Sequence, residues 1–253
     1  MLKLPGHKII EIILTAMTAM AKPGVKTIDI NKKAEKLIKL HGVTSINKGY
    51  CPPWAFKPFP TATCININNV IAHGIPDETE LKEGDIVAFD LGIRDSQGNC
   101  ADAAVTVGVG GISMADKKLL FYAYQTMMEG VENLVAGANT ETIARKIEQY
   151  AIMRGYTINR KFGGHAIGKE MHESPKIYNT TEPTHNYAVI QEGQVFCVEP
   201  MVTYGADSFG IADKNGWTHR TRDGKNSAVF EVMAKVTKGA PEILTNHIIP
   251  PEY

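Results

Sequence analysis

The sequence lacks an excess of charge of either sign and any long apolar run. Its 253 residues carry 27 basic and 27 acidic side chains, so the formal net charge is zero. A neutral chain gives no electrostatic reason to bind nucleic acid or an anionic membrane. No stretch approaches the roughly 18 consecutive apolar residues of a membrane span. We therefore expect a globular protein with no nucleic-acid partner and no membrane partner.

Cysteine is also scarce. The four cysteines are Cys51, Cys64, Cys100 and Cys197, and no two of them form a Cys-x-x-Cys pair. This spacing gives no support to a zinc ribbon or a thioredoxin-type motif. A long chain with few cysteines is typical of a reducing compartment, with disulfides as the less favoured alternative. We therefore expect a cytoplasmic protein.

The N-terminal segment has two interpretations. Lys3 and Lys8 precede the apolar run 9–14, and small residues follow it, as in a signal peptide. Glu11 interrupts that run, however. Apolar residues also recur at helical spacing, namely Ile9, Ile10, Ile13, Met17 and Met20. This periodicity favours an amphipathic helix.

Two segments of the chain match each other at an offset of 113 residues, 24–43 and 137–156. Each reads as a loop, a threonine N-cap, a helix and a terminating glycine. The expected N-caps are Thr27 and Thr140. Helices of this kind are common, so this match is weak when taken alone.

A second match follows in the same order at an offset of 109 residues, 83–90 and 192–199. Each segment has an acidic-Gly turn, an apolar strand and then a carboxylate, Asp90 in one and Glu199 in the other. Two matches in order predict two related halves, which are too few for a repeat array. We therefore predict one pseudo-symmetric α+β domain over residues 1–253.

Each half continues into a further strand. A turn over 94–99 follows Asp90, and 101–107 reads as a strand with Asp102 near its start. A hairpin centred on Ser96 would place Asp90 and Asp102 directly opposite each other. Like charges in that position are destabilising, so another group must offset the cost.

Carboxylates accompany the strongly apolar strands. The four are Asp90, Asp102, Glu199 and Glu231. Residues 227–236 read as a strand that contains Glu231 and would pair with the Glu199 strand. A single acid of this kind could simply point to water, but buried carboxylates need a partner or a metal. Four at repeat-related places favour a metal site, in which shared acids would bridge two divalent cations about 3.5–4 Å apart.

His165 is the expected nitrogen ligand of that site. It lies in the glycine-rich segment 162–168, where glycine permits close backbone approach, and His172 follows nearby. A lone histidine in a loop is more often a surface residue, so the glycines and His172 carry the functional interpretation. Mostly oxygen ligands with one nitrogen suit Mn²⁺, Fe²⁺ or Co²⁺ and tolerate Zn²⁺.

This ordered set of motifs resembles the type I methionine aminopeptidases. The matching pieces are 22–25, 72–77, Asp90, Asp102, 164–168 with His172 and Glu173, 196–201, 216–218 and 230–231. They span nearly the whole chain. The resemblance implies the pseudo-two-fold pita-bread fold, an α+β fold with a central curved antiparallel sheet and helices on its outer face.

The resemblance also implies roles for individual residues. The implied metal ligands are Asp90, Asp102, His165, Glu199 and Glu231, with Asp102 and Glu231 bridging two metal ions (Co, Mn, Fe or Zn). The implied catalytic residues are His73, His172 and Glu199, and both histidines would contact substrate. The implied walls of the methionine pocket are Cys64, Tyr50 and Trp217, with Met171 as a further candidate. The implied activity is removal of the initiator methionine from nascent polypeptides, including polypeptides still at the ribosome. The implied oligomeric state is a monomer.

The sequence departs from the family pattern at several places. These are one extra residue between Asp90 and Asp102, Ala166 in place of glycine, Val232 in place of histidine, and a longer segment 49–60 that should border the pocket. We expect the Gly98 turn to absorb the extra residue as a bulge. The departures keep open an alternative, a catalytically weak or metal-free binding protein on the same fold.

Other enzymes of the fold are less favoured by the sequence. Aminopeptidase P and prolidase usually carry an additional N-terminal domain. A type II methionine aminopeptidase would carry a helical insert between its last two metal glutamates. The 32 positions from Glu199 to Glu231 leave no space for that insert.

Overall fold

The computed structural model describes residues 4–53 and 55–253. Lys3 and Trp54 lie outside the described residues. The helices are α1 (Gly6–Thr18), α2 (Thr27–His41), α3 (Met114–Glu132) and α4 (Thr140–Met153). The strands are β1 (Thr44–Ser45), β2 (Cys64–Ile67), β3 (Val70–Ala72), β4 (Ile86–Arg94), β5 (Cys100–Gly108), β6 (Thr157–Ile158), β7 (Gly163–Ala166), β8 (Glu173–Tyr178), β9 (Val195–Val198), β10 (Met201–Thr203), β11 (Ile211–Ala212), β12 (His219–Arg220), β13 (Ser227–Val229), β14 (Val232–Lys235) and β15 (Glu242–Ile243).

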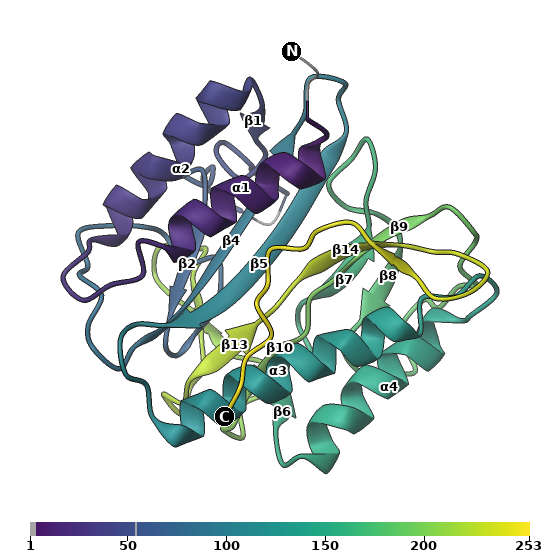
Figure 1. Ribbon diagram of the computed structural model, residues 1–253. Helices are drawn as coiled ribbons and strands as arrows, with labels where there is room; N and C mark the ends of the chain where they lie inside the picture. The colour runs from purple at the N-terminus through teal and green to yellow at the C-terminus, as the bar shows by residue number, and fades with distance from the viewer. Residues whose placement is uncertain (1–3, 54) are drawn as a thin grey trace.

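Two pairs of helices cover one face of a set of antiparallel sheets (Figure 1). Helix α1 packs on α2 and on strands β4 and β5, whereas α3 packs on α4 and on strands β9, β10 and β13. The C-terminal segment, drawn in yellow, runs between the two helix pairs (Figure 1). The sheets have the orders β1-β4-β2 with β5 added to β4, β13-β10-β6, β11-β12-β3 and β15-β14-β9-β7-β8. This arrangement confirms the α+β class and the helices on an outer face.

Helix α1 is the amphipathic helix that the N-terminal periodicity predicted. Its apolar side chains Ile10, Ile13, Leu14 and Met17 have no exposed surface. They join the main hydrophobic core together with residues of β4 and β5. None of the helices in the described residues is long and apolar enough to cross a membrane.

Helices α2 and α4 form the first predicted repeat, with one local difference. Their N-caps are Lys26 and Asn139, each one residue earlier than predicted. Thr27 and Thr140 are instead the first helical residues, and their hydroxyls accept hydrogen bonds from the backbone N–H of Asp77 and Ala188 respectively. The prediction of threonine caps was wrong because distant loops use these hydroxyls.

Backbone hydrogen bonds repeat between the two halves. The Gly24 N–H donates to the Leu81 carbonyl, and the Gly137 N–H donates to the Ile190 carbonyl, both at a donor–acceptor distance of 2.8–2.9 Å. The turn glycines Gly84 and Gly193 both have φ near 89°. The same hydrogen-bond pattern therefore fixes each helix start and each following strand, as expected of two related halves.

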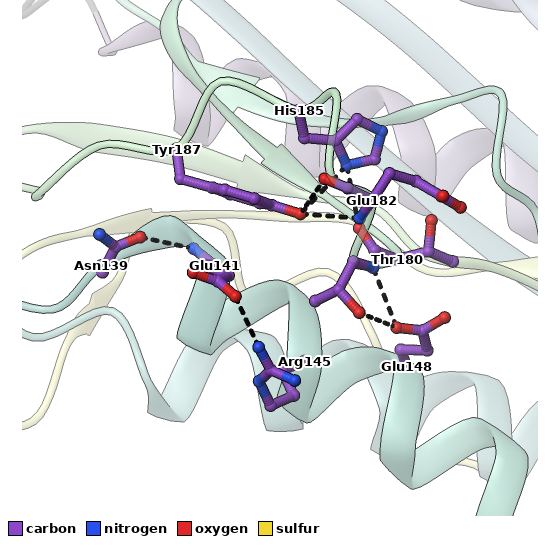
Figure 2. A network of polar contacts seen from close by, with 9 residues as sticks. Asn139, Glu141, Arg145, Glu148, Thr180, Glu182, His185 and Tyr187 are labelled. Atoms are coloured by element: carbon purple, nitrogen blue, oxygen red, sulfur yellow. Dashed lines mark hydrogen bonds and ion pairs between the residues drawn. The ribbon is translucent and has the colours of Figure 1, made fainter.

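A polar network holds the loop that follows β8 against α4 (Figure 2). Glu148 accepts hydrogen bonds from both the N–H and the hydroxyl of Thr181, at 2.9 and 2.6 Å. In the first half the corresponding Glu35 forms an ion pair of 2.7 Å with Lys48. The glutamate at this repeat position thus ties its helix to a later loop in both halves.

The β4–β5 hairpin differs in register from the one predicted. Asp90 lies opposite Ala104, and Asp102 lies opposite Gly92, so the two acids are diagonal neighbours rather than a directly opposed pair. The strands pair without a bulge from Ile86 to Arg94, and the extra residue lies in the turn 95–99. Asp90 is also in the middle of β4, not at its end.

The strand predicted over 227–236 is two strands, β13 and β14. β13 pairs with β10, and β14 pairs with β9 as expected for the Glu231 segment. Glu231 lies at the break, where its N–H donates to the carbonyl of Ala104 at 3.0 Å. This break joins the Glu231 backbone to β5 and so brings the two halves together at Ala104.

The four cysteines are free, and Cys51 is the exposed one. Cys64, Cys100 and Cys197 are buried. This arrangement agrees with the preference for reduced cysteines, which stays a prediction.

Candidate metal centre

The acids of the first half share one face of the β4–β5 hairpin. Cross-strand partners point to the same side, and side chains alternate along a strand. Asp90, its partner Ala104 and Asp102 therefore project from the same face. Glu231 joins them because its backbone pairs with Ala104. Asp102 and Glu231 are buried, with 5% and 2% exposure.

The candidate ligands of the second half come from β7 and from the residue that follows β9. His165 pairs with Cys197, and Glu199 follows two residues later along the chain. His165 Nε2 lies 3.6 Å from Glu199 Oε1 and 3.9 Å from Asp102 Oδ2. The histidine thus sits between an acid of each half.

Glycine allows β7 to approach its neighbours at the position of His165. A Cβ on Gly164 would lie 2.1 Å from the carbonyl oxygen of Cys197, and one on Gly163 would lie 2.9 Å from that of Ile177. Only glycine fits such contacts. The sequence-based expectation of a close backbone approach at this histidine is confirmed.

The tautomer of His165 leaves one nitrogen free for a metal. Its Nδ1 lies 3.0 Å from the carbonyl oxygen of Ala166. A carbonyl only accepts, so Nδ1 carries the proton and the Nε2 lone pair points to the acids. Burial and the nearby His172 lower the pKa of His165 to about 4, which keeps the ring neutral.

Buried polar atoms without a partner mark the centre of the cluster. Among the described residues, Asp102 Oδ1, His165 Nε2 and Glu231 Oε1 are buried and accept or donate no hydrogen bond. One donor atom from each of Asp102, His165, Cys197 and Glu231 lies within 4.8 Å of the others. Unsatisfied buried groups of this kind are costly unless an ion binds them. The donor set therefore fits divalent cations.

The electrostatics of the acids agree with a cation site. Burial raises the pKa of Asp90 to about 7. Burial, and then the charge of Asp90, raise the pKa of Asp102 well above its ordinary value. The pKa values of Glu199 and Glu231 are raised for the same two reasons, burial first and repulsion from the other acids second. A bound cation would supply the positive charge that stabilises the ionised form of these acids.

His73 is held rigidly directly after β3, with its ring 6.1 Å from that of Trp217. Its backbone is left-handed, with φ of 57°, and its carbonyl accepts a 3.1 Å hydrogen bond from the Thr218 hydroxyl. The Gly74 N–H donates to the side chain of Asn66 at 2.8 Å. Burial, and then the neighbouring His219, lower the pKa of His73 to about 4. A neutral imidazole in a fixed orientation can donate a hydrogen bond to a substrate or accept one from it.

His172 lies against the candidate ligand His165. Its ring centroid is 4.5 Å from that of His165 and 6.1 Å from that of Tyr50. Burial is the main cause that lowers the pKa of His172. His73 and His172 are thus both neutral and both close to residues of the cluster or its pocket.

A small apolar cluster of side chains lies next to Asp90. Phe59, Cys64 and Trp217 are each 2–3% exposed and pack together, with the Phe59 and Trp217 rings in edge contact at 5.2 Å. Cys64 lies opposite Asp90 on the neighbouring strand β2. The Tyr50 ring is 6.3 Å from Trp217. The residues predicted from the sequence as pocket walls therefore lie near one another beside Asp90, and their role as a pocket stays a prediction.

Two further features lie near this cluster. The indole N–H of Trp217 donates to the carbonyl of Lys57 at 3.0 Å, so the longer segment contacts the cluster at Lys57. The Met171 side chain lies over Gly92, which is opposite Asp102. That the longer segment and Met171 border a methionine pocket stays a prediction.

Sequence reasoning missed residues that the structure brings to the site. They are Lys161, Phe162, Cys197 and His219. Strand alternation could have identified Cys197, because it lies two residues before Glu199. The other three are brought in by tertiary contacts between segments distant in the sequence.

Comparisons with known proteins identify relatives of this chain. Residues 6–238 match the model of metallopeptidase family M24. The chain is 36% identical to a methionine aminopeptidase of Clostridium perfringens over 238 residues, which are 94% of this chain and 92% of the relative. The crystal structure of the methionine aminopeptidase from Rickettsia prowazekii has a TM-score of 0.87 at 34% identity and covers 95% of this chain and 94% of that one. A prolidase from Pyrococcus horikoshii has a TM-score of 0.74 at 21% identity over 61% of its own length, which is a similarity of fold alone.

Proposed function

This chain belongs to metallopeptidase family M24, and on that premise we propose that it removes N-terminal methionine from polypeptides with two divalent metal ions. The observation that carries the proposal is the cluster of buried acids around the free Nε2 of His165, beside the apolar cluster of Phe59, Cys64 and Trp217. Methionine aminopeptidases are similar to the chain over nearly its full length.

The proposed ligands are Asp90, Asp102, His165, Glu199 and Glu231. Asp102 and Glu231 are buried with donor atoms near that of His165, so both would be available to hold either ion. Two divalent cations, when bound, supply an acidified water as nucleophile near neutral pH. Mn²⁺, Fe²⁺ and Co²⁺ suit a set of four carboxylates and one imidazole, and Zn²⁺ is tolerated.

The chain's own residues would orient the substrate. The pocket of Phe59, Cys64 and Trp217 receives the methionine side chain, whose sulfur packs well on aromatic edges. His73 and His172 are the proposed hydrogen-bonding partners of the scissile amide and of the tetrahedral intermediate. Glu199, partly exposed at 17%, is the proposed general base.

The test is a peptidase assay with metal-free and Mn²⁺-loaded protein. Met-Ala-Ser should be cleaved by the loaded protein, whereas Leu-Ala-Ser should be cleaved far more slowly. Chelation should abolish the activity, and Mn²⁺, Fe²⁺ or Co²⁺ should restore it. Full activity of metal-free protein would refute the metal mechanism, and preferential cleavage before proline would instead favour a prolidase-type activity.

A further inference from the structure

One cation beside the site lacks a carboxylate partner. Arg160 forms an ion pair with Glu182, and Arg220 Nε lies 2.8 Å from Asp213 Oδ2. In the described part of the chain, no carboxylate lies in ion-pair range of the exposed Lys161. Among these three cations, Lys161 alone keeps an uncompensated charge.

A neutral histidine fixes the position of that charge. Lys161 Nζ lies 2.7 Å from His219 Nε2, and His219 Nδ1 lies 2.8 Å from the carbonyl oxygen of Trp217. The carbonyl requires a proton on Nδ1, so Nε2 accepts from the ammonium group. His219 is 4% exposed, and burial together with Lys161 lowers its pKa. The ammonium is thus anchored without being neutralised.

A row of rings connects this ammonium to the candidate pocket. The His73 ring is 6.1 Å from Trp217 on one side and 6.1 Å from His219 on the other. Phe162 lies 5.2 Å from His73 and 5.0 Å from His219. Trp217 belongs to the methionine pocket, so the row leads from that pocket past His73 to Lys161.

We propose that Lys161, anchored on His219, is a specificity-determining residue that binds an acidic side chain in the polypeptide beyond the scissile bond. The inference rests on the proposed function. Once the methionine side chain binds next to Trp217, the residues after it must run from the buried centre to the surface. The row of rings that ends at Lys161 would line that path. An anchored, uncompensated ammonium at its end attracts carboxylates and repels cations.

The anchoring explains why Lys161 can discriminate between substrates. A free lysine loses side-chain entropy when it forms an ion pair, and that loss cancels much of the Coulomb gain. The contact with His219 has already restricted Lys161 before substrate arrives. The remaining interaction is exposed, so the expected preference is modest and sensitive to salt.

The experiment compares kcat/KM for Met-Ala-Xaa-Ser and Met-Ala-Ser-Xaa peptides in which Xaa is Glu, Gln or Lys, with Mn²⁺-loaded protein. Wild type should prefer Glu over Lys by roughly two- to fivefold in at least one series, the range of an exposed ion pair. The preference should lie mainly in KM, because binding in ground and transition state is alike, and it should fall with added salt.

Variants assign the preference to the residue. Lys161→Met should abolish it, Lys161→Glu should invert it, and Lys161→Arg should keep it. Lys36→Met removes the same charge from the exposed face of α2 and should leave the preference as in wild type. An unchanged Glu-to-Lys ratio in Lys161→Met, or equal cleavage of all three peptides by wild type, would overturn the inference. Failure of wild type to cleave any of the peptides would instead overturn the proposed function.

Discussion

Asp90 and Asp102 project from the same face of the β4–β5 hairpin as diagonal neighbours, with Ala104 opposite Asp90 and Gly92 opposite Asp102. The diagonal offset increases the separation of their carboxylates relative to a direct pair. It also leaves room for the Met171 side chain over Gly92. The two acids nevertheless repel each other, since the charge of Asp90 raises the pKa of Asp102.

The first prediction concerns that repulsion. Metal-free Asp90→Asn should be at least as stable as metal-free wild type, because the substitution removes one of several crowded anions. With Mn²⁺ the order should reverse, because ligands that bind the native state stabilise it and the variant has lost one of them. Thermal melts of both proteins, with and without Mn²⁺, measure the two differences.

Asp29→Asn is the matched control for these melts. Asp29 forms an exposed ion pair with Lys32 on α2, and such pairs contribute little to stability. Its substitution should shift the melting midpoint equally with and without metal. An equal shift for Asp90→Asn would mean that Asp90 is an ordinary strand acid and not a ligand.

The second prediction is a pH dependence of the metal-free protein. The pKa of Asp90 rises on folding from 3.8 to about 7, and those of Asp102, Glu199 and Glu231 rise as well. Such groups hold protons in the native state that the unfolded chain releases, so stability is lost as the pH rises through the folded pKa values. His165 and His73 act in the opposite sense, but only below 6.5, because folding lowers their pKa from that value to about 4.

The measurement is therefore clearest from pH 6.5 upward. The melting midpoint of metal-free protein should fall by at least 2–4 °C by about pH 8, the shift that roughly 1 kcal/mol causes in a chain of this size. Saturating Mn²⁺ should flatten the dependence, since bound acids are ionised throughout. A metal-free midpoint that rises over this interval would contradict the burial of the acids.

Local sequence patterns predicted the helices and strands well, but they predicted the helix caps and the strand register less well. The spacing of Ile10, Ile13 and Met17 identified α1, because a buried helix face leaves a periodic trace. The threonine caps were wrong because Thr27 bonds to a loop 50 residues away. The hairpin register was off because the turn is centred on Gln97 and not on Ser96, with Asp95 accepting the N–H groups of Gln97 and Asn99.

The site was predictable to the extent that its residues stand in ordered motifs. The acids and His165 follow the repeat and the glycine-rich segment, and the structure brings them together. The contact between Lys161 and His219 could not be predicted from the sequence, because 58 residues separate them and neither stands in a recognisable pattern. Cys197 was visible from alternation, but a lone cysteine in a strand usually indicates no more than burial.

The third prediction separates His73 from the metal ligands. His73→Ala should lower kcat by roughly 10²–10⁴-fold, the usual range for acid–base assistance, while the metal content stays at the wild-type level. His73→Asn is the matched variant, because asparagine tolerates the left-handed backbone at φ of 57°. Metal analysis and kinetics on a Met-Ala-Ser peptide decide the matter, and loss of metal in both variants would make His73 a ligand.

The fourth prediction tests the close approach at β7. Gly164→Ala should destabilise the protein by about 1–3 kcal/mol, the usual cost of overpacking, because the added Cβ would lie 2.1 Å from the Cys197 carbonyl oxygen. Gly239→Ala is the control, since a Cβ there meets no atom within 4 Å. Urea unfolding of both variants measures the difference. Equal midpoints would show that the strands can separate without cost.

The last prediction concerns Cys197, whose Sγ lies within 4.8 Å of donor atoms of Asp102, His165 and Glu231. Burial, and then the nearby carboxylates, raise the pKa of its thiol well above the ordinary value. With hard cations such as Mn²⁺ the thiol should therefore stay protonated, and the oxygen and nitrogen donors suffice. A soft cation such as Cd²⁺ prefers sulfur and can displace the proton.

Cys197→Ser should accordingly leave Mn²⁺ affinity nearly unchanged but lower Cd²⁺ affinity by roughly tenfold or more, the lower end of losses on altering groups around a metal. Calorimetric titrations with both ions measure the affinities, and the ultraviolet absorption of a Cd²⁺–thiolate bond should appear in wild type and not in the variant. Cys100→Ser is the control, because Cys100 is buried with its Sγ 3.2 Å from the carbonyl oxygen of Lys169 and lies outside the donor cluster. Parallel losses of Mn²⁺ and Cd²⁺ affinity in Cys197→Ser would mean that the side chain only shapes the site and never binds the ion.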